Sequence, residues 1–388
     1  MSDENLTELQ RDLVEHARKI ASEFSLTYWH EKDEAAEYPW EFVRAFADAG
    51  YMGIIVPTEY GGLGLGITEA ALLLREIAAS GAGTSGASAV HFYVFPPAPI
   101  IHHGSDEMKS KFLPQMAKGE LLMAFGVTEP NSGSDTSRTS TKAVRDGDRW
   151  LINGQKVWTT NAQNASHILL LTRTSPRDEE HPHEGMTLFF VPLDREHCTI
   201  RVIKKLGRAA VDSNELFMDN LEAQDSDIVG EIGKGFYHLI TGLNPERIVL
   251  AMEAVGIGLA ALRLATDYAR ERVVFNNPIG SYQAVAHPLA DSWARLQGAE
   301  LMAMRAADLF DQGKHCGAEA NAAKYLAADA GFQACDAALQ THGGFGYARE
   351  YHIERLWREA RLFRLAPISQ EMVLNYLSER VLGLPKSY

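Results

Sequence analysis

Apolar residues recur every three or four positions along the first third of the chain, the spacing of helices that bury one face. The segment RDLVEHARKIASEFS follows this period, and so does EYPWEFVRAFADAGYMG, with Pro39 near its start and Gly50 near its end. ITEAALLLREIAAS is apolar on nearly every side, so we expect that helix to be buried. The pattern predicts an N-terminal helical domain over residues 1–123.

The pattern changes to that of strands between about Ala124 and Asp227. ASHILLLTRTS, GMTLFFVPLD, CTIRVIKKL and NELFMDNLEA are each about one strand long and rich in β-branched or aromatic residues. RWLINGQKVWTT carries Asn153-Gly154 between two such runs, which predicts a hairpin that turns at this dipeptide. These segments predict a central β domain over residues 124–232.

Helical spacing returns at about Gly233. ERIVLAMEAVGIGLAALRLATDYARER is long enough for about seven turns and apolar on most faces, as expected of an interior helix of a bundle. An Ala-rich helix that ends at Gly343-Gly344 follows, and a last helix has Ser369 as its N-cap. We expect a C-terminal helical bundle over residues 233–388, and therefore a mostly α protein with a central β domain.

Composition narrows the classes of function. The chain has 37 basic and 51 acidic side chains, a net charge of −14, which makes it a poor partner for nucleic acid. Its three cysteines show no CxxC spacing, so neither a disulfide framework nor a metal site is expected. The uncharged stretch Ile77–Ser105 contains Gly, Ser and Pro, which favours a buried helix followed by a loop over a membrane span. The start, MSDENLTELQRD, lacks a secretion signal and favours a bacterial cytoplasmic protein, although a processed mitochondrial chain would look similar.

Two segments of the central region carry candidate binding groups. GVTEPNSGSDTS, residues 126–137, offers backbone N–H groups and hydroxyls to a polar ring or an amide chain, although a simple turn has the same composition. In VWTTN, strand alternation would place Trp158 and Thr160 on one face. An aromatic ring beside a hydroxyl donor suits a planar heterocycle, and such pairs also line ordinary cores.

Two further segments lie in the C-terminal region. In RERVVFNNPIGSYQ, Arg272 is a fork-shaped donor suited to a pyrophosphate, or simply a solvated residue at a helix end. The glycines of QTHGGFGYAREYHIERLWRE permit close approach of the backbone to a ligand, or form a helix C-cap and a turn. No GxGxxG follows a strand and no GxxxxGK[ST] is present, so a nicotinamide or phosphate-loop site is unsupported.

In this order and spacing the four segments resemble the acyl-CoA dehydrogenase family. GVTEPNSGSDTS and QTHGGFGYAREYHIERLWRE look like its two signatures, and WTTN, FLPQMAKGE, and RVVF followed eight residues later by Gln283 also correspond. The resemblance covers essentially the whole chain. It implies a helical N-terminal domain, a β-barrel-like middle and a C-terminal four-helix bundle. It also implies FAD held between subunits of a homotetramer (a dimer of dimers), an acyl-CoA substrate, and electron-transfer flavoprotein as acceptor.

The resemblance also assigns residues. Those it implies around the flavin of the same subunit are Phe125, Val127, Thr128, Ser134, Trp158, Thr159 and Thr160. Those it implies for the FAD of the neighbouring subunit are Arg272, Phe275, Gln283, Gln340, Gly343 and Gly344, with Gln370 on the adenine side. Those it implies near the acyl-CoA are Ser134, Asn244 and Arg247.

The expected reaction needs one carboxylate base, because a saturated thioester must lose a proton from Cα and a hydride from Cβ. Most family members carry the base near the C-terminus in a Tyr-Glu-Gly-Thr run, where this chain has Ala366. The isovaleryl and long-chain types carry it on a central helix in an xERxVLA run, and here NPERIVLA places Glu246 at that position. Asn-Pro-Glu also suits a helix start, with Asn244 as N-cap and a first-turn acid favoured by the helix dipole.

Two other functions remain open from the sequence. An oxygen-using relative, an acyl-CoA oxidase or a flavin monooxygenase, is disfavoured by Glu246, and a non-catalytic flavin-bound scaffold by the acidic charge. The apolar run HFYVFPPAP is a candidate lining for an acyl pocket, and Ala366 with Pro367 leaves space for branching near Cα. The length of the acyl group and the pathway are not indicated.

Overall fold

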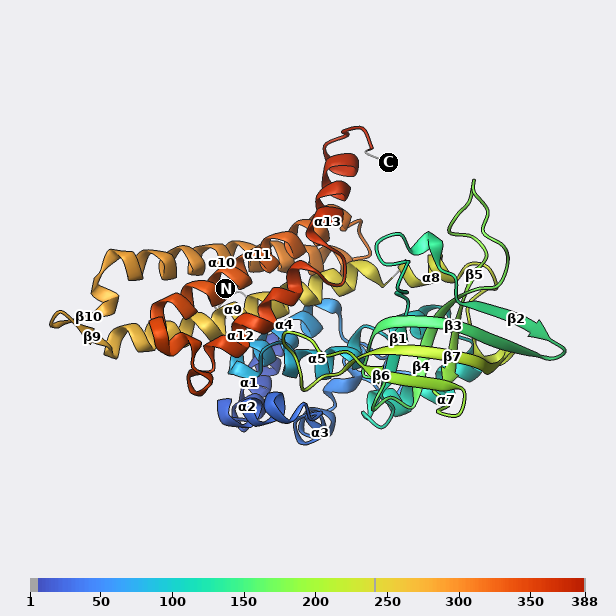
Figure 1. The fold of residues 1–388 in the computed structure, drawn as a ribbon, viewed down its shortest axis with the longest axis horizontal. Coiled ribbons are helices and arrows are strands. Elements are labelled where there is room, and N and C mark those ends of the chain that lie inside the picture. Colours follow the sequence, from blue (N-terminus) through green and yellow to red (C-terminus); the bar gives the residue numbers. More distant parts are fainter. Residues whose placement is uncertain (1–5, 241, 387–388) are drawn as a thin grey trace.

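The computed structural model of the protein describes residues 6–240 and 242–386. Helices, a β-sheet and a second set of helices follow one another along the chain. Figure 1 shows the sheet at one end of an elongated molecule, while the C-terminal helices extend to the other. The predicted fold class, mostly α with a central β region, is confirmed.

The N-terminal region is helical, as predicted. Thr7 and Gln10 form a capping box at the first helix: Thr7 Oγ1 accepts the N–H of Gln10 (3.2 Å) and Gln10 Oε1 accepts that of Thr7 (3.1 Å). The fourth helix is buried along its whole length, as its all-round apolar sequence predicts. The bounds of the helices are α1 Glu8–Ser22, α2 Leu26–Ala35, α3 Trp40–Asp48, α4 Ile67–Ile77, α5 Gly83–Val94, α6 Ala98–His103 and α7 Asp106–Ala117.

The uncharged stretch after α4 differs from its prediction in one respect. The buried helix is present as α5, but a short helix, α6, stands where a loop was expected. Pro99 lies in its first turn, where a missing N–H costs no hydrogen bond, so the prolines help to start this helix.

The central region forms one sheet. The strands follow the order β6-β7-β3-β2-β4-β5-β8, and β1 pairs in parallel with β4. Their bounds are β1 Met123–Gly126, β2 Lys142–Asp146, β3 Arg149–Thr160, β4 His167–Arg173, β5 Met186–Pro192, β6 Cys198–Val202, β7 Ser213–Gln224 and β8 Ile228–Val229. Buried apolar residues of β4 and β5 pack on both faces, so this sheet builds its own core.

The hairpin predicted at Asn153-Gly154 is wrong. The dipeptide lies inside the long strand β3, and the turn occurs earlier, at Gly147-Asp148, where Asp146 pairs with Arg149. A register shift between Ile152 and Gly154 marks a bulge in the pairing with β7. A Cβ at Gly154 would lie 2.5 Å from Thr141 Oγ1. The glycine therefore serves a close strand-to-strand approach rather than a turn.

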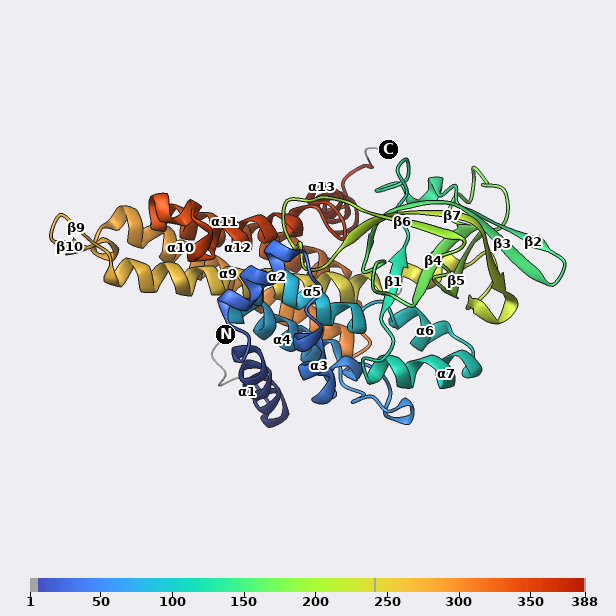
Figure 2. The ribbon, with the colours of Figure 1, turned by 60° about the horizontal axis from the view of Figure 1, so that its bottom comes forward.

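The C-terminal region is a bundle around a long central helix. The bounds of its helices are α8 Gly235–Ile240, α9 Leu243–Glu271, α10 Gln283–Asp311, α11 Gly317–His342, α12 Ile353–Ala360 and α13 Gln370–Tyr376. Two short strands, β9 Val273–Val274 and β10 Asn277–Pro278, turn the chain between α9 and α10 at the far end of the molecule (Figures 1 and 2). As predicted, α11 ends at Gly343 and Ser369 caps α13, its Oγ accepting the N–H of Met372.

The central helix of the bundle is unusually apolar. Among the described residues, the stretch Gly235–Glu271 is long and apolar enough to cross a membrane by length and composition, but 78% of its most apolar window is buried inside the protein. Helices α10, α11 and α4 pack against α9. This burial is what a bundle core requires of such a helix.

Candidate functional site

The aromatic part of the predicted site lies at the end of β3. Trp158 has a φ of 62° and is 56% exposed, while Thr159 and Thr160 are buried. A register shift between Lys156 and Thr159 shows that β3 bulges here. Strand alternation therefore does not determine the relative directions of Trp158 and Thr160, because the backbone at Trp158 is not extended. The bulge instead leaves the large indole of Trp158 exposed, between the partly buried Val157 and the buried Thr159.

Phe125 links the sheet to the N-terminal helices. It lies on β1, and its ring packs edge-on against Phe95 at the end of α5, with 5.1 Å between ring centroids. The carbonyl of Thr128 accepts the N–H of Val157 (2.9 Å), which joins the loop after β1 to the bulged end of β3. The loop that carries Val127 and Thr128 therefore lies against the end of β3, next to Trp158 in the sequence.

The loop over residues 126–137 is anchored by a group that the sequence reasoning missed. Glu129 is buried, accepts the N–H and hydroxyl of Ser140 (2.7 and 2.6 Å), and forms an ion pair with Lys156 (2.8 Å). The Lys156 ammonium also donates to the carbonyl of Val127 (3.1 Å). Burial raises the pKa of Glu129, but Lys156 and the hydroxyl donors outweigh it and bring the pKa to about 2. Ser134 lies exposed on this loop.

Glu246 occupies the first turns of α9. It is partly accessible, and among the described residues no side chain donates a hydrogen bond to its carboxylate or forms an ion pair with it. Burial raises the pKa of Glu246 to about 7; His91 and Arg247 act to lower it, and Glu253 acts to raise it. A carboxyl with this pKa exchanges its proton near neutral pH, as a general base must.

The start of α9 differs from the one that the Asn244-Pro245-Glu246 sequence predicted. The N-cap is Gly242, so Asn244 lies inside the helix and does not cap it. Its side-chain oxygen instead accepts a hydrogen bond from Arg247 Nη1 (3.0 Å), and burial lowers the pKa of Arg247. The predicted acyl-CoA residues Asn244 and Arg247 therefore form a pair one turn apart, beside Glu246.

A second carboxylate, also missed from the sequence, lies two turns further along α9. Glu253 is fully buried, and its Oε1 lies 2.7 Å from His91 Nδ1 on α5, while Oε2 has no hydrogen-bond partner among the described residues. Residues seven apart share a helix face, so Glu246 and Glu253 lie on one stripe of α9. The apolar run around His91 had drawn attention only as a candidate lining.

A mostly apolar cavity of about 150 Å³ lies against the first turns of α9, and neither Glu246 nor Glu253 lines it. Val94, Phe95 and Ala98 line it from the run HFYVFPPAP, and Pro245 and Val249 line it from α9. The last two residues stand on either side of Glu246 in the sequence. The structure thus brings the candidate lining and the candidate base to one region.

The remaining predicted cofactor residues lie at the other end of the molecule. Glu246 and Arg272 stand at opposite ends of α9, which are separated by about 40 Å for a rise of 1.5 Å per residue. Figures 1 and 2 both show β9 and β10 far from the sheet. Gathered at that end are Arg272, Phe275, Gln283, Gln340, Gly343 and Gly344. One chain therefore does not bring the two groups of predicted flavin residues together.

This far end carries exposed aromatic side chains. Phe275 and Tyr347 are each 85% exposed, and a Cβ added at Gly344 would meet no atom within 4 Å. The guanidinium of Arg272 lies over the ring of Phe345, 6.0 Å from its centroid. Such a group of exposed aromatic side chains is typical of a surface that another molecule covers. Gln370 is the first residue of α13, apart from this group.

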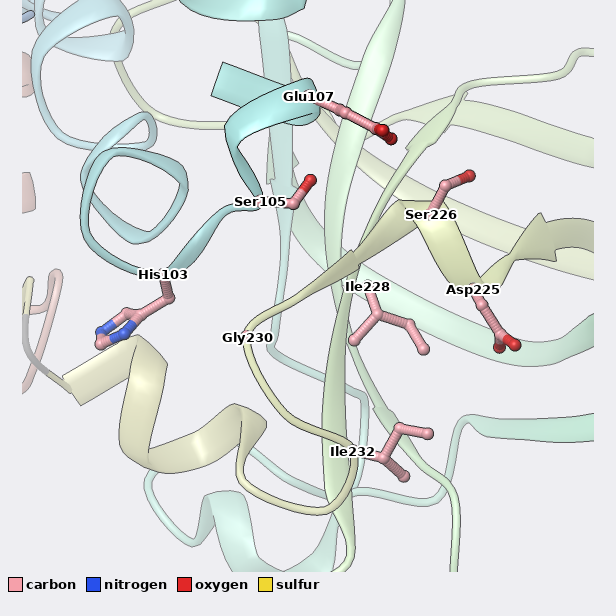
Figure 3. A pocket seen from close by; sticks show the side chains of 8 residues that line it. All are labelled: His103, Ser105, Glu107, Asp225, Ser226, Ile228, Gly230 and Ile232. Carbon is pink, nitrogen blue, oxygen red and sulfur yellow. The ribbon is translucent and has the colours of Figure 1, made fainter. Parts of the chain in front are cut away.

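A larger hollow than the cavity against α9 lies elsewhere. It has a volume of about 580 Å³ and lies between the start of α7 and the segment around β8. Figure 3 shows the side chains that line it, among them His103, Glu107 and Asp225. None of the predicted site residues lines it. Within the described residues, no group of three His, Cys, Asp or Glu side chains is arranged to hold a metal ion.

These residues fit FAD. The exposed indole of Trp158 offers a face to a planar ring, and Thr159 Oγ1 and the side-chain amide of Asn161 are polar atoms without partners among the described residues. The open backbone at Gly344 and the exposed guanidinium of Arg272 suit a phosphate-bearing chain. Together with the fold, these groups are those expected of an FAD-dependent oxidoreductase.

The chain belongs to the acyl-CoA dehydrogenase family. Its residues 7–120, 124–221 and 233–382 match the family models for the N-terminal, middle and C-terminal domains of acyl-CoA dehydrogenase. It is 38% identical over 384 residues to acyl-CoA dehydrogenase FadE12 of Mycobacterium tuberculosis, covering 96% of each chain.

The chain is also similar to a subunit of a reductase complex and to a solved dehydrogenase structure. The chain is 32% identical over 359 residues to the CarC subunit of the caffeyl-CoA reductase-Etf complex of Acetobacterium woodii, covering 90% of this chain and 92% of that one. Its fold matches that of glutaryl-coenzyme A dehydrogenase in complex with glutaryl-CoA, with a TM-score of 0.93, 29% identity, and coverage of 99% of this chain and 97% of that one. The family resemblance inferred from the sequence motifs is confirmed.

Proposed function

We propose that the protein removes a proton from Cα and a hydride from Cβ of an acyl-CoA thioester, and that Glu246 is the base. The observation that carries this proposal is a largely buried carboxyl with a pKa of about 7 and no side-chain partner among the described residues. A carboxylate held in an ion pair would be a weaker base, because its partner stabilises the charged form.

Each neighbouring residue has a role in this reaction. Glu246 accepts the Cα proton, and the charges of His91 and Arg247 keep enough of it ionised at neutral pH. The Asn244–Arg247 pair lies beside it to bind the thioester or the CoA chain. When bound beside Trp158, FAD supplies the electrophile that takes the hydride. Phe125 and Phe95 shield the site from water, which strengthens each polar contact inside.

The cavity lined by Val94, Pro245 and Val249 supports a short, branched or cyclic acyl group. Its volume of about 150 Å³ is similar to that of cavities that hold one benzene ring. A longer chain would need side chains such as Phe95 to move. We expect short and cyclic acyl-CoA esters to reduce the flavin faster than straight chains of more than about eight carbons, in an anaerobic panel of both kinds.

We also propose a homotetramer, built as a dimer of dimers, and electron-transfer flavoprotein as the electron acceptor. The separation of Trp158 from Arg272 and the exposure of Phe275 support a site completed by a second copy. The similarity to a subunit of an Etf complex supports the acceptor. Light scattering of the holoenzyme tests the tetramer, and reduction of electron-transfer flavoprotein in place of oxygen tests the acceptor.

Anaerobic mixing of the FAD-loaded protein with acyl-CoA tests the reaction. We expect bleaching of the flavin and release of the α,β-unsaturated thioester. Glu246→Gln is expected to retain FAD and to lose at least about a thousandfold in the rate of bleaching, because proton removal loses its base. Glu222→Gln, which alters an exposed pair with Arg149 on the sheet, is the control. An unchanged rate in Glu246→Gln would refute the assignment, and peroxide formed in step with turnover would indicate an oxidase.

A further inference from the structure

One oxygen of a fully buried carboxylate has no hydrogen-bond donor. Glu253 lies in the interior of α9, where its Oε1 is 2.7 Å from His91 Nδ1 on α5, and its Oε2 has no partner among the described residues. The nearby guanidinium of Arg208 donates to three hydroxyl groups instead. A buried acceptor without a donor costs free energy, so the chain leaves a place for a donor at Oε2.

His91 stands next to the cavity along α5. It precedes Val94 by three residues and Phe95 by four, so the three side chains share one side of the helix. The ring of His91 packs against that of Phe95, with 5.9 Å between the ring centroids. Val94 and Phe95 line the cavity of about 150 Å³. The His91–Glu253 pair thus contacts the wall of this cavity without lining it.

The same order holds along α9. Pro245 and Val249 line the cavity, and Glu253 follows Val249 by four residues, one turn further on the same side of the helix. Glu246 precedes Glu253 by two turns, which is about 10 Å along the helix axis. An acyl group that starts at Glu246 and extends along α9 past Val249 therefore reaches the His91–Glu253 pair.

The chemistry of the pair selects a hydroxyl group. An ionised carboxylate only accepts hydrogen bonds, so the missing partner of Oε2 must be a donor. A second carboxylate would be repelled by Glu253, and an ammonium group would have to lose its hydration among side chains such as Phe95 and Val249. A hydroxyl group is neutral and donates to Oε2. The same group can share a hydrogen bond with His91 Nε2, which forms none within the described part of the chain.

We propose that the His91–Glu253 pair binds a hydroxyl group on the far part of the acyl chain, and that the substrates of this protein are hydroxylated acyl-CoA thioesters. The proposal rests on the proposed function, since Glu246 fixes where the acyl group begins. An acyl group that ends in a methyl group would leave Oε2 unpaired. A site that hydrogen-bonds a hydroxyl group discriminates strongly against the analogue that lacks it, because the polar groups of the site are then left without partners. His91 and Glu253 thus determine specificity and stand apart from the reacting atoms.

The test is the affinity of the FAD-loaded protein for inert S-alkyl-CoA thioethers, measured by titration calorimetry at pH 7.5. These probes have no thioester carbonyl, so neither a proton nor a hydride is removed from them. The panel holds ω-hydroxyalkyl-CoA probes of about four to eight carbons, because the two carboxylates are about 10 Å apart along α9. Each is compared with the alkyl-CoA one carbon longer, in which a methyl group replaces the hydroxyl group. At the best-fitting length we expect the hydroxyl probe to bind about tenfold tighter, because its hydrogen bond is to a charged acceptor.

Glu253→Met is expected to abolish this preference and to leave the affinity for the alkyl probe nearly unchanged. The matched control is Asp267→Asn, an exposed acid on the same helix, which is expected to keep the preference. Should Glu253→Met fail to hold FAD, Glu253→Gln keeps the shape and loses the charge, and is expected to reduce the preference about threefold.

The absence of a preference for the hydroxyl probe at every length would overturn the proposal, since it is the result expected if a buried water satisfies Oε2. A preference that stays at its natural size in each Glu253 variant that holds FAD would overturn it equally. Because the probes do not react, both results are independent of whether Glu246 is the base.

Discussion

Two clusters of buried charge in this protein differ in how they are paired. The first joins α1, α4 and α10: Arg75 binds Glu76 and Glu300 directly, and Arg18 binds the second oxygen of Glu76 (2.6 Å). Burial alone would lower the pKa of Arg75, but the two carboxylates raise it above its ordinary value. Every charge in this cluster has an opposite charge in contact, so it holds three helices together and has nothing left to react.

The second cluster, between α5, α9 and the sheet, is incomplete. Glu246 has no side-chain partner among the described residues, Glu253 has one unpaired oxygen, and Arg208 contacts only hydroxyls. Glu246 is shifted toward its neutral form, and Arg208 is held by neutral hydroxyl groups. The difference separates charges that build the structure from charges that are kept available for chemistry.

The largest expected effect on stability comes from a substitution that breaks the paired cluster. Arg75→Met removes the guanidinium that binds Glu76 and Glu300, and is expected to lower the free energy of unfolding by on the order of 4 kcal/mol, because it leaves buried carboxylates without their cation. Urea unfolding of the holoenzyme measures the loss. The control is Arg149→Met, whose pair with Glu222 is exposed on both sides and worth about 0.5 kcal/mol. Equal losses in the two variants would remove the distinction between the clusters.

The second largest expected effect is a gain in the free energy of unfolding rather than a loss. The pKa of Glu246 is about 7 in the folded protein, above the ordinary 4.5. The folded protein therefore loses stability as the pH rises from about 4.5 to 7, because Glu246 ionises less readily in the folded than in the unfolded chain. The full loss is present above pH 7. Glu246→Gln carries no charge and is expected to be more stable than the natural protein at pH 8, by on the order of 2 kcal/mol, and equally stable at pH 4.5. Thermal unfolding at both pH values checks this. An equal difference in stability at the two pH values would contradict an unfavourable ionised Glu246 in the folded protein.

The smallest effect tests the coupling inside the site. Glu253→Gln removes a negative charge that raises the pKa of Glu246, so the rise of kcat/KM with pH is expected to move about half a unit to lower pH. Asp267→Asn, an exposed residue three turns or more further along α9 that pairs with Arg270, is expected to leave the profile in place. An unmoved profile in Glu253→Gln would show that the two carboxylates of the α9 stripe act independently.

The sequence predicted most of the fold because its signals are periodic. Long apolar helices such as α4 and α9 and β-branched strands such as β4 are determined by local pattern. The Asn153-Gly154 turn was wrong because a glycine also serves where two segments approach closely, and that reason depends on Thr141, the residue just before β2. Asn244 was misplaced as a cap because helix boundaries shift by one or two residues with little change in pattern.

The site was only partly predictable for a similar reason. Glu246, Trp158 and Arg272 stand in recognisable motifs. Arg208, His91 and Glu253 do not, since their importance comes from contacts across more than a hundred residues of sequence. One signal was available for Glu253: a single acid in the middle of an otherwise apolar helix face implies a buried partner.

The length of α9 has a consequence for mixed populations of the protein. In the proposed assembly, one polypeptide contributes Glu246 to a given catalytic centre and its neighbour contributes Arg272. Two inactive variants, each damaged at a different end of α9, would then complement each other after subunit exchange, regenerating one intact centre in each hybrid dimer. The helix that spans the bundle thereby makes catalysis a shared property of two polypeptides.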